Sequence, residues 1–337
     1  MKFLITGHTG FKGSWLSLLL NAQGHELFGI SLDPNKNSFY RQANLSDMFS
    51  RDIRLDICDK NKLSRAIKRI EPDVIIHLAA QSIVRKSYLA PMQTFETNVL
   101  GTLNVLESTR RLENIKATLI ITTDKVYKND ENSNSFVETD PLGGYDPYSG
   151  SKAAADIAAQ SWINSFANAP VAIARAGNVI GGGDWSSDRL VPDIVRSILK
   201  SEQIKLRFPD AVRPWQHVLD CLNGYLTLIH RQVNEKFDGS WNFGPNLEAV
   251  KPVKSLVNSF TEAWGIKDEK WIQSENDGLQ ESKYLSLDSS KARNILGWRE
   301  KLNFEDSISW TVDWYRNVNS KNVQQISMNQ VEKFLKL

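Results

Sequence analysis

Cysteine is scarce in this chain, which has only Cys58 and Cys221 among 337 residues and no CxxC pair. A disulfide framework or a cysteine-based zinc site is therefore not expected, no metal site is predicted, and a reducing compartment is the natural setting. Net charge is also small, because 41 Lys and Arg face 39 Asp and Glu, for a formal charge of +2. Such a weak field gives no basis for binding nucleic acid or a membrane surface.

Long apolar runs are missing as well. The longest, such as VIIHLAA at 74–80, fall far short of the ~20 residues that a membrane helix requires. The opening MKFLITG carries one lysine and no small-residue cleavage site, so it predicts a β-strand rather than a signal peptide. With 41% hydrophobic and 24% charged residues, the composition is that of a globular protein. We expect a cytoplasmic protein with one large domain or two domains.

Short apolar segments alternate with helical patterns through the first half of the chain. Apolar segments without polar alternation are typical of strands buried on both faces, and hence of a parallel sheet with crossover helices. The sequence therefore predicts an α/β fold, a Rossmann-type doubly wound parallel sheet with a smaller mixed α/β substrate-binding domain. The predicted strands are 2–6, 26–31, 53–56, 74–77, 118–122 and 171–174. The predicted helices are 11–23, 60–70, 95–111 and 148–165.

The alternation breaks after Arg175, where a glycine-rich segment follows and tryptophans become frequent. Residues 1–177, with about 213–243, are expected to form the Rossmann domain, because the WNF segment at 241–243 is predicted to return to the first sheet. The smaller domain is expected at 178–212 and 244–316. The remaining residues, 317–337, are predicted as a polar C-terminal tail, to which we assign no function.

A glycine-rich segment, Gly7-His-Thr-Gly-Phe-Lys-Gly13, lies between the first predicted strand and its helix. Glycines at such a turn allow the sharp bend, the approach of a pyrophosphate to the backbone, and close packing of helix on sheet. The N–H groups of the following helix then face the anion. A structural turn is the alternative explanation of these glycines. The candidate phosphate-binding residues are Gly7, Thr9, Gly10, Phe11, Lys12 and Gly13.

Acidic residues after the second and third strands complete the predicted dinucleotide site. Asp33 lies 20 residues past Gly13, where an acid would accept a hydrogen bond from the adenosine ribose. An acid there disfavours a 2′-phosphate, so NAD is expected rather than NADP, although Lys36 lies close by in the sequence. Asp56 and Ile57 are expected at the adenine edge, and a solvated turn acid is the alternative for Asp56.

Tyr148 and Lys152 lie four residues apart and so share one face of a predicted helix. Free tyrosine titrates near ~10, and an adjacent cation is expected to lower its pKa toward that of a base. Thr123 and Asp124 follow a predicted strand at its carboxyl end, where open α/β sheets bind ligands. We expect Thr123 to hydrogen-bond the reacting hydroxyl and Asp124 to act as an acid. A surface helix and a turn are the alternatives.

Taken together, these segments resemble the extended short-chain dehydrogenase/reductase family, from Lys2 to about Trp298. Further segments carry the resemblance: HLAAQ at 77–81, TNVLGTLNVLE at 97–107, TTDKVY at 122–127, DPYSGSK at 146–152, ARAGNVIGGGDW at 174–185, RPWQHVLD at 213–220, WNFGP at 241–245 and LGW at 296–298. Within the family, GHTGFKGSWLSLLL at 7–20 and LAAQSIVRKSY at 78–88 are most similar to the 4,6-dehydratases that act on CDP-glucose.

The resemblance implies an NAD-dependent hydro-lyase for a nucleotide sugar, CDP-glucose. Hydride would leave C4 of the hexose, water would be lost across C5–C6, and hydride would return to C6, giving a 4-keto-6-deoxy sugar of the kind used in lipopolysaccharide O-antigens. It also implies a homodimer, or a tetramer, that assembles through the helices at 95–111 and 148–165. An NDP-sugar 4-epimerase is the alternative activity, and a catalytically inactive NAD-binding regulator is the alternative class.

The resemblance further assigns roles to individual residues. Tyr148 and Thr123 would flank the C4 oxygen, Lys152 would hold the nicotinamide ribose, and Asp124 would protonate the departing 6-hydroxyl. Lys125 stands where the wider 4,6-dehydratase pattern has a glutamate base; it would act as a neutral base, stabilise the enolate by its charge, or simply pair with Asp124. Leu78, Ala79 and Ala80 would line the cofactor site. The substrate-binding candidates are Gln81, Asn178, Arg189, Arg213 and Glu281.

Overall fold

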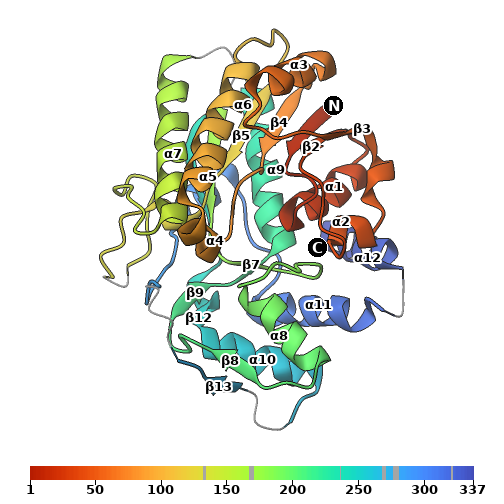
Figure 1. Cartoon of the computed structure of the whole chain (residues 1–337), viewed down its shortest axis with the longest axis vertical. Coiled ribbons are helices and arrows are strands. Elements are labelled where there is room, and N and C mark those ends of the chain that lie inside the picture. The colour runs from red at the N-terminus through yellow and green to blue at the C-terminus, as the bar shows by residue number, and fades with distance from the viewer. Residues whose placement is uncertain (132–133, 167–170, 236, 268–270, 276–280, 320–321) are drawn as a thin grey trace.

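A parallel seven-stranded sheet forms the larger layer of the protein (Figure 1). The computed structural model describes residues 1–337 apart from 132–133, 167–170, 236, 268–270, 276–280 and 320–321. The strand order is β11-β6-β5-β4-β1-β2-β3, and every neighbouring pair is parallel. The strands are β1 Lys2–Thr6, β2 Glu26–Ser31, β3 Phe49–Arg54, β4 Val74–His77, β5 Ala117–Ile121, β6 Val171–Ala176 and β11 Gly239–Phe243.

Alternating residues of these strands feed two cores on opposite faces of the sheet. In β1, Phe3 and Ile5 pack with Trp15 and its helix, whereas Leu4 packs with Leu63 on the other face. All residues of β4, β5 and β6 are buried, which explains why their sequences lack polar alternation. The predicted doubly wound fold is confirmed. One face carries α1 (Phe11–Ala22) and α9 (Val218–Glu235), and the other carries α3 (Lys60–Ile70), α6 (Gly101–Thr109) and α7 (Pro147–Ser165).

Two of the predicted elements differ from the structure by more than two residues at one end. The strand expected at 53–56 runs from Phe49 to Arg54, because it is a sheet edge whose polar FSRDIR sequence gives no apolar signal. The helix expected at 95–111 begins earlier, as α5 (Pro91–Phe95), continues through one π-helical stretch (Glu96–Leu100), and ends with α6. The segment at 241–243 lies in β11, paired with β6. The domain limits proposed from the sequence stay predictions.

A smaller layer lies beyond the carboxyl ends of the strands, in the lower half of Figure 1. It contains three two-stranded pairs, and only one of them, β9 with β12, is antiparallel. Helices α8, α10 and α11 pack around them (Figure 1). The elements are β7 Val179–Ile180, α8 Leu190–Leu199, β8 Ile204–Leu206, β9 Val212–Pro214, β10 Gln216–His217, β12 Val250–Pro252, α10 Val253–Trp264, β13 Trp271–Gln273 and α11 Phe304–Asn317.

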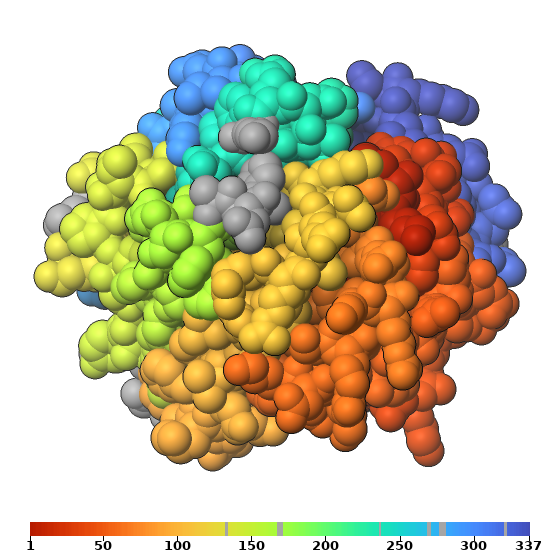
Figure 2. Space-filling view, turned by 90° about the horizontal axis from the view of Figure 1, so that it is seen from above, coloured from red at the N-terminus to blue at the C-terminus, as the bar shows by residue number. Residues whose placement is uncertain are grey.

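The C-terminal segment, predicted only as a polar tail, contains helix α12 (Val323–Lys336). Two of its apolar side chains, Val331 and Phe334, are fully buried, and the helix packs against α1 and α11. The indole N–H of Trp314 in α11 donates a hydrogen bond to Ser327 Oγ at 2.8 Å. Figure 2 shows these last residues, in blue, against the red N-terminal part of the chain. Among the described residues, no helix has the length and apolar character needed to cross a membrane.

We predict that α12 contributes substantially to stability. Phe334→Ala should lower the free energy of unfolding by about 3–5 kcal/mol, since truncating a buried phenylalanine removes apolar contacts and leaves a cavity. Leu335→Ala is the matched control, because Leu335 is 38% exposed on the same helix and should cost well under half as much. Urea unfolding of both variants measures the difference. Equal effects would mean that α12 does not pack as described.

Candidate active site

A cavity of about 1290 Å³ opens between the two layers, at the carboxyl ends of the sheet strands. The strand order reverses between β1 and β4, and ligands of open α/β sheets bind at such a switch point. Loops after β1, β4, β5 and β6 form its upper wall, while α8 and β8 form its lower wall. The cavity is therefore where the fold predicts a site.

The glycine-rich turn after β1 lines this cavity with Gly7, Thr9, Gly10, Phe11, Lys12 and Gly13. Gly7 has a φ of +77°, and a Cβ there would lie 2.6 Å from the backbone nitrogen of Ala79. A Cβ on Gly13 would lie 2.3 Å from the carbonyl oxygen of Gly7. Gly10 caps α1 without a side-chain hydrogen bond, so the first N–H groups of the helix are available to a phosphate.

Of the residues predicted for the adenosine end of the dinucleotide, two line the cavity and one does not. Asp56 and Ile57 line the cavity, and Asp56 Oδ1 accepts a hydrogen bond from the N–H of Cys58 at 2.9 Å. Asp33 is not among the lining residues; its side chain is 79% exposed and lies 3.5 Å from the Nε of Arg54. The wall after β4 is formed, as expected, by Leu78, Ala79 and Ala80.

Three of the predicted catalytic side chains meet at one point of the cavity wall, and a fourth, Lys152, lines the same cavity. Thr123 follows β5, and its hydroxyl donates a hydrogen bond to Asp124 Oδ1 at 3.0 Å. The same hydroxyl is hydrogen-bonded to Tyr148, in the first turn of α7. Asp146 caps that turn by accepting from the N–H of Ser149 at 3.0 Å. Lys152 lies one turn further along α7, and its Nζ donates to the carbonyl of Ile121 at 2.7 Å.

Burial sets the protonation of this cluster. It raises the pKa of Tyr148 to about 12, although hydrogen bonding to Thr123 and the charge of Arg189 oppose the rise. The expectation that Lys152 would lower the pKa of Tyr148 below its ordinary value is therefore wrong for the structure as it stands. Burial also lowers the pKa of Lys152 to about 8, and its ammonium is held by a carbonyl rather than by the phenol.

Asp124 has the properties of an acid. Its side chain is buried, burial raises its pKa, and the charges of Lys125 and Arg213 offset only part of that rise. Its Oδ2 is buried without a hydrogen-bond partner among the described residues. If Asp124 is protonated on Oδ2, its O–H can donate a hydrogen bond only to a ligand that places an acceptor next to it. Lys125 follows directly, half-buried, and also lines the cavity.

Four of the five substrate-binding candidates lie on the wall of the cavity. Asn178, Arg189, Arg213 and Glu281 line the cavity, and the Arg213 guanidinium, 4% exposed, is 3.5 Å from Glu281 Oε1. Gln81 does not line it. Its side chain instead accepts from the N–H of Ile83 and donates to Thr94, so the structure corrects its predicted role. Gln81 holds the loop after β4.

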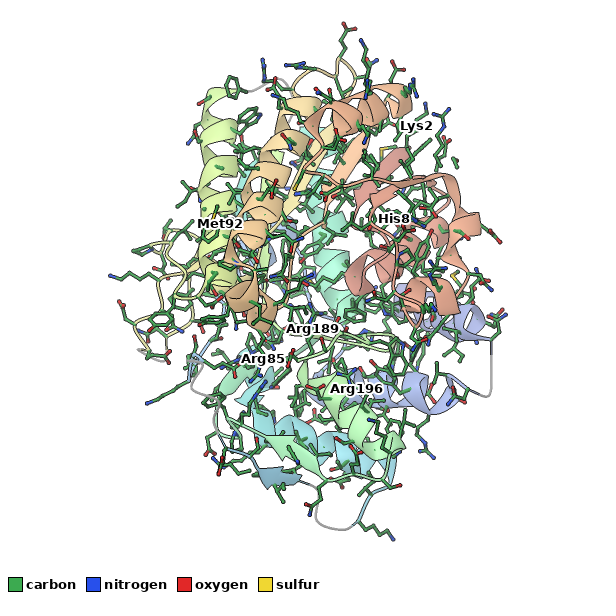
Figure 3. All side chains as sticks on the ribbon, in the orientation of Figure 1. Lys2, His8, Arg85, Met92, Arg189 and Arg196 are labelled. Atoms are coloured by element: carbon green, nitrogen blue, oxygen red, sulfur yellow. The ribbon has the colours of Figure 1, made fainter. Side chains whose placement is uncertain are left out.

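Further cations of the cavity were missed by the sequence analysis. Arg85 pairs with Asp188 at 3.5 Å. Arg189, which was predicted, donates to Ser82 Oγ at 3.2 Å. Figure 3 shows Arg85, Arg189 and Arg196 between the two layers. The other unpredicted cations on the lower wall are Lys200, Lys205 and Arg207. Such a wall suits a diphosphate. Among the described residues, no group of three or more His, Cys, Asp or Glu could hold a metal ion.

Comparison with known proteins agrees with this geometry. The GDP-mannose 4,6 dehydratase family matches residues 4–311. The chain is 42% identical to a CDP-glucose 4,6-dehydratase of Salmonella typhimurium over 94% of this chain and 90% of that protein. It is 29% identical to a dTDP-glucose 4,6-dehydratase of Haemophilus influenzae, over 94% of this chain and 98% of that protein.

Solved structures share the fold. The dTDP-glucose 4,6-dehydratase DesIV of Streptomyces venezuelae, with NAD and TYD bound, has a TM-score of 0.81 and 26% identity, covering 94% of this chain and 97% of that one. A UDP-glucose 4-epimerase of Thermotoga maritima has a TM-score of 0.81, covering 95% of this chain and 100% of that one; at 22% identity, this likeness shows the fold alone. The fold and site define a nucleotide-sugar-modifying short-chain dehydrogenase/reductase, which confirms the predicted resemblance. Within that class, the chain belongs to the GDP-mannose 4,6 dehydratase family.

We predict that Lys152 makes the protein more stable as the pH rises. Its pKa falls from an ordinary 10.5 to about 8 in the folded state, so between these values the unfolded chain binds a proton that the folded chain has lost. Stability then rises with pH, by at most about 1.4 kcal/mol per unit. Urea unfolding at pH 7.5 and 9.5 should show a smaller rise for Lys152→Met than for the unchanged protein. Lys128→Met, which changes an exposed lysine, should keep the full rise in stability. If both variants show the same rise, folding does not lower the pKa of Lys152.

Proposed function

We propose that the protein is an NAD-dependent 4,6-dehydratase that converts CDP-glucose to CDP-4-keto-6-deoxyglucose. The observation that carries this proposal is the contact between Thr123, Tyr148 and Asp124, which joins a base for C4 oxidation to a buried acid. The 42% identity to the Salmonella CDP-glucose 4,6-dehydratase supports CDP-glucose as the substrate. Both cysteines are free, which agrees with a cytoplasmic location.

The residues of the cavity fit a dinucleotide. The turn from Gly7 to Gly13 and the start of α1 would hold its phosphates, Asp56 and Ile57 its adenine, and Lys152 the nicotinamide ribose. NAD, when bound, supplies a hydride acceptor that is regenerated in the same turnover, so no second substrate is needed. The pyrophosphate of the sugar nucleotide would lie against Arg213 and Arg189. Displacing Glu281 from Arg213 would free its guanidinium for a bidentate contact.

Oxidation at C4 requires Tyr148 to take the proton of the 4-hydroxyl. A tyrosine with a pKa of about 12 is a poor base at neutral pH, so the positive charge of an oxidised nicotinamide nearby would have to lower it. Thr123 would hydrogen-bond the same oxygen. Lys152, whose ammonium is held by the carbonyl of Ile121, would act through the nicotinamide ribose and so keep the cationic ring beside the phenol.

Elimination requires an acid and a means of removing the C5 proton. The 4-ketone makes the C5–H acidic, and Asp124 would donate its proton to the departing 6-hydroxyl, which leaves as water. The C5 proton would pass to a water, and the proton that Tyr148 took from the 4-hydroxyl would restore Asp124. Hydride would then return to C6 and a solvent proton to C5, so the overall change is the loss of one water. Lys125, next to Asp124 on the cavity wall, would stabilise the enolate through its charge. A 4-epimerase would have no use for a protonated Asp124.

Isotope transfer tests the reaction. CDP-glucose deuterated at C4 should give product with deuterium at C6 and solvent hydrogen at C5, as read by NMR. The protein should convert the dTDP, UDP and GDP analogues more slowly than CDP-glucose. Tyr148→Phe, the matched control, should bind NAD yet lose orders of magnitude in rate. Return of the label to C4 without solvent exchange would show an epimerase, and release of label into free NADH would show a simple dehydrogenase.

Lys125→Met should separate oxidation from elimination. Without the ammonium, the enolate loses its stabilisation, so exchange of the C5 hydrogen with solvent deuterium should fall at least tenfold. Oxidation at C4, followed by the absorbance of enzyme-bound NADH, should survive. Lys128→Met, three residues further on and exposed, controls for the lost charge. Wild-type C5 exchange and turnover in Lys125→Met would remove this lysine from the elimination.

We also propose a homodimer, assembled through the helices at 91–109 and 147–165. Large apolar side chains remain exposed there: Met92 81%, Leu100 54%, Ile157 54% and Phe95 39%. Apolar side chains gathered on neighbouring helices are typical of a protein–protein interface.

Light scattering at micromolar concentration should report the mass of two chains. Leu100→Glu with Ile157→Glu should reduce it to one, because buried unpaired carboxylates oppose association. Leu247→Glu is the matched control, since Leu247 is 71% exposed but lies away from these helices, and it should leave the dimer intact. A monomer for the unchanged protein would refute the proposal.

A further inference from the structure

Lys12 belongs to the glycine-rich turn, yet a second helix anchors its ammonium. It lies half-buried in the first turn of α1 and lines the cavity. Its Nζ donates a hydrogen bond at 3.3 Å to the hydroxyl of Tyr225, a fully buried residue of α9. Helix α9 packs against β5, the strand that Thr123 and Asp124 follow. The ammonium is therefore held on the side of the cavity where the reacting groups lie.

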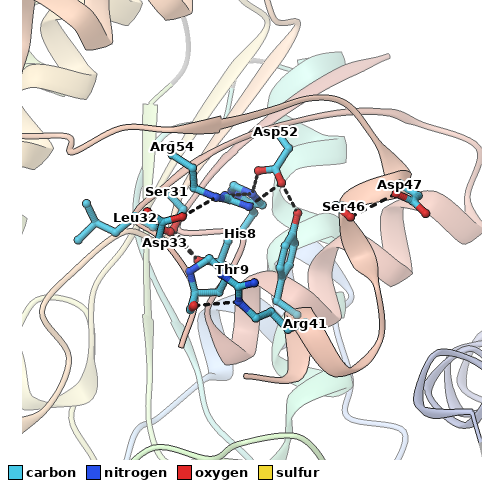
Figure 4. A network of polar contacts seen from close by, with 12 residues as sticks. His8, Thr9, Ser31, Leu32, Asp33, Arg41, Ser46, Asp47, Asp52 and Arg54 are labelled. Atoms are coloured by element: carbon cyan, nitrogen blue, oxygen red, sulfur yellow. Dashed lines mark hydrogen bonds and ion pairs between the residues drawn. The ribbon is translucent and has the colours of Figure 1, made fainter. Parts of the chain in front are cut away.

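The turn that carries Lys12 is itself fixed from behind, by the network drawn in Figure 4. The His8 side chain is fully buried, and its Nε2 lies 2.7 Å from Asp52 Oδ1 on β3. The hydroxyls of Thr9 and of Ser31, the last residue of β2, are hydrogen-bonded at 2.7 Å. The turn is thus tied to two strands on one side, and Lys12 is tied to α9 on the other. The position of this cation is set by the fold.

The charge of Lys12 reaches two of the residues assigned to the reaction. Burial raises the pKa of Asp124, and Lys12 is one of the cations that oppose this rise. Burial is also the main cause of the lowered pKa of Lys152, and the charge of Lys12 acts in the same direction. A cation that influences both side chains also acts on a charge that appears or disappears between them.

We propose that Lys12 is a further functional residue, whose charge raises the reduction potential of a nicotinamide ring bound in the cavity. When the C4–H bond of the sugar breaks, both of its electrons go to the ring, whose charge falls from +1 to zero, and the hydroxyl proton goes to Tyr148. A fixed cation nearby therefore favours the reduced, neutral ring over the oxidised one. The inference rests on the proposed NAD site and goes beyond the phosphate contact predicted for Lys12, because the phosphates carry the same charge in both forms.

The dissociation constants of NAD and NADH, measured by calorimetry, test the proposal without any turnover. Lys12→Gln removes the charge but keeps a donor for Tyr225. The ratio of the NAD constant to the NADH constant should fall roughly fivefold or more, the size expected for one charge acting over several ångströms. Such a fall equals about 20 mV in a two-electron potential. Lys12→Met should give the same fall, whereas Lys12→Arg should keep the original ratio. Lys68→Gln, which removes an exposed lysine in the last turn of α3, should also keep it.

Equal weakening of NAD and NADH in Lys12→Gln would overturn the proposal, because the charge would then act only on the phosphates that both forms share. Unchanged affinities would overturn it too. A fall in the ratio that Lys12→Arg also shows would assign the effect to shape rather than to charge. Thermal unfolding of each variant shows that the fold is retained. Failure of both nucleotides to bind the unchanged protein would instead refute the proposed cofactor, a different result from any of these.

Discussion

A buried ion pair between Asp156 and Arg175 holds the catalytic residues in register. Both side chains are at most 1% exposed, and two nitrogens of Arg175 donate to the two oxygens of Asp156 at 2.9 and 2.7 Å. Thr122 also donates to Asp156 at 2.9 Å. One carboxylate thus joins α7, which carries Tyr148, to the end of β5 and to β6. Because a buried charge without its partner is costly, these three elements cannot shift independently.

Burial then shifts the pKa values of the residues that this pair positions. The shift favours the proposed role of Asp124 and opposes the roles proposed for Tyr148 and Lys152. A raised pKa suits Asp124, which has to be protonated before it can expel water. The same burial keeps the Tyr148 phenol protonated, so that it does not readily accept a proton, and it lowers the fraction of Lys152 that is charged. In the proposed reaction, elimination would be favoured by the site as it is built, whereas oxidation would need the cationic ring of the cofactor beside Tyr148. Catalysis would then be coupled to a bound cofactor by electrostatics alone.

The sequence predicted those parts of the site that are formed by residues a few positions apart in the chain. Glycine spacing identified the turn at Gly7, and the four-residue spacing of Tyr148 and Lys152 identified their shared helix face. Predictions failed where a role depends on residues far apart in the chain. Gln81, for example, turns into the loop after β4 and hydrogen-bonds Ile83 and Thr94. The helix at 323–336 was missed because its apolar residues are few. Their role becomes visible only in the structure, where they pack against α1 and α11.

The two layers divide the work of the enzyme. Reacting groups stand on strand ends and α7, which are packed on both sides and fixed by buried pairs. The lower wall of the cavity is made of short strand pairs and charged loop residues, whose ion pairs, such as Arg85 with Asp188 and Arg213 with Glu281, are long and partly exposed. Changes there cost little stability. Relatives named for CDP-glucose and for dTDP-glucose both match nearly the whole chain. The proposed function accounts for this if the chemistry is tied to the core and the choice of nucleotide to the lower wall.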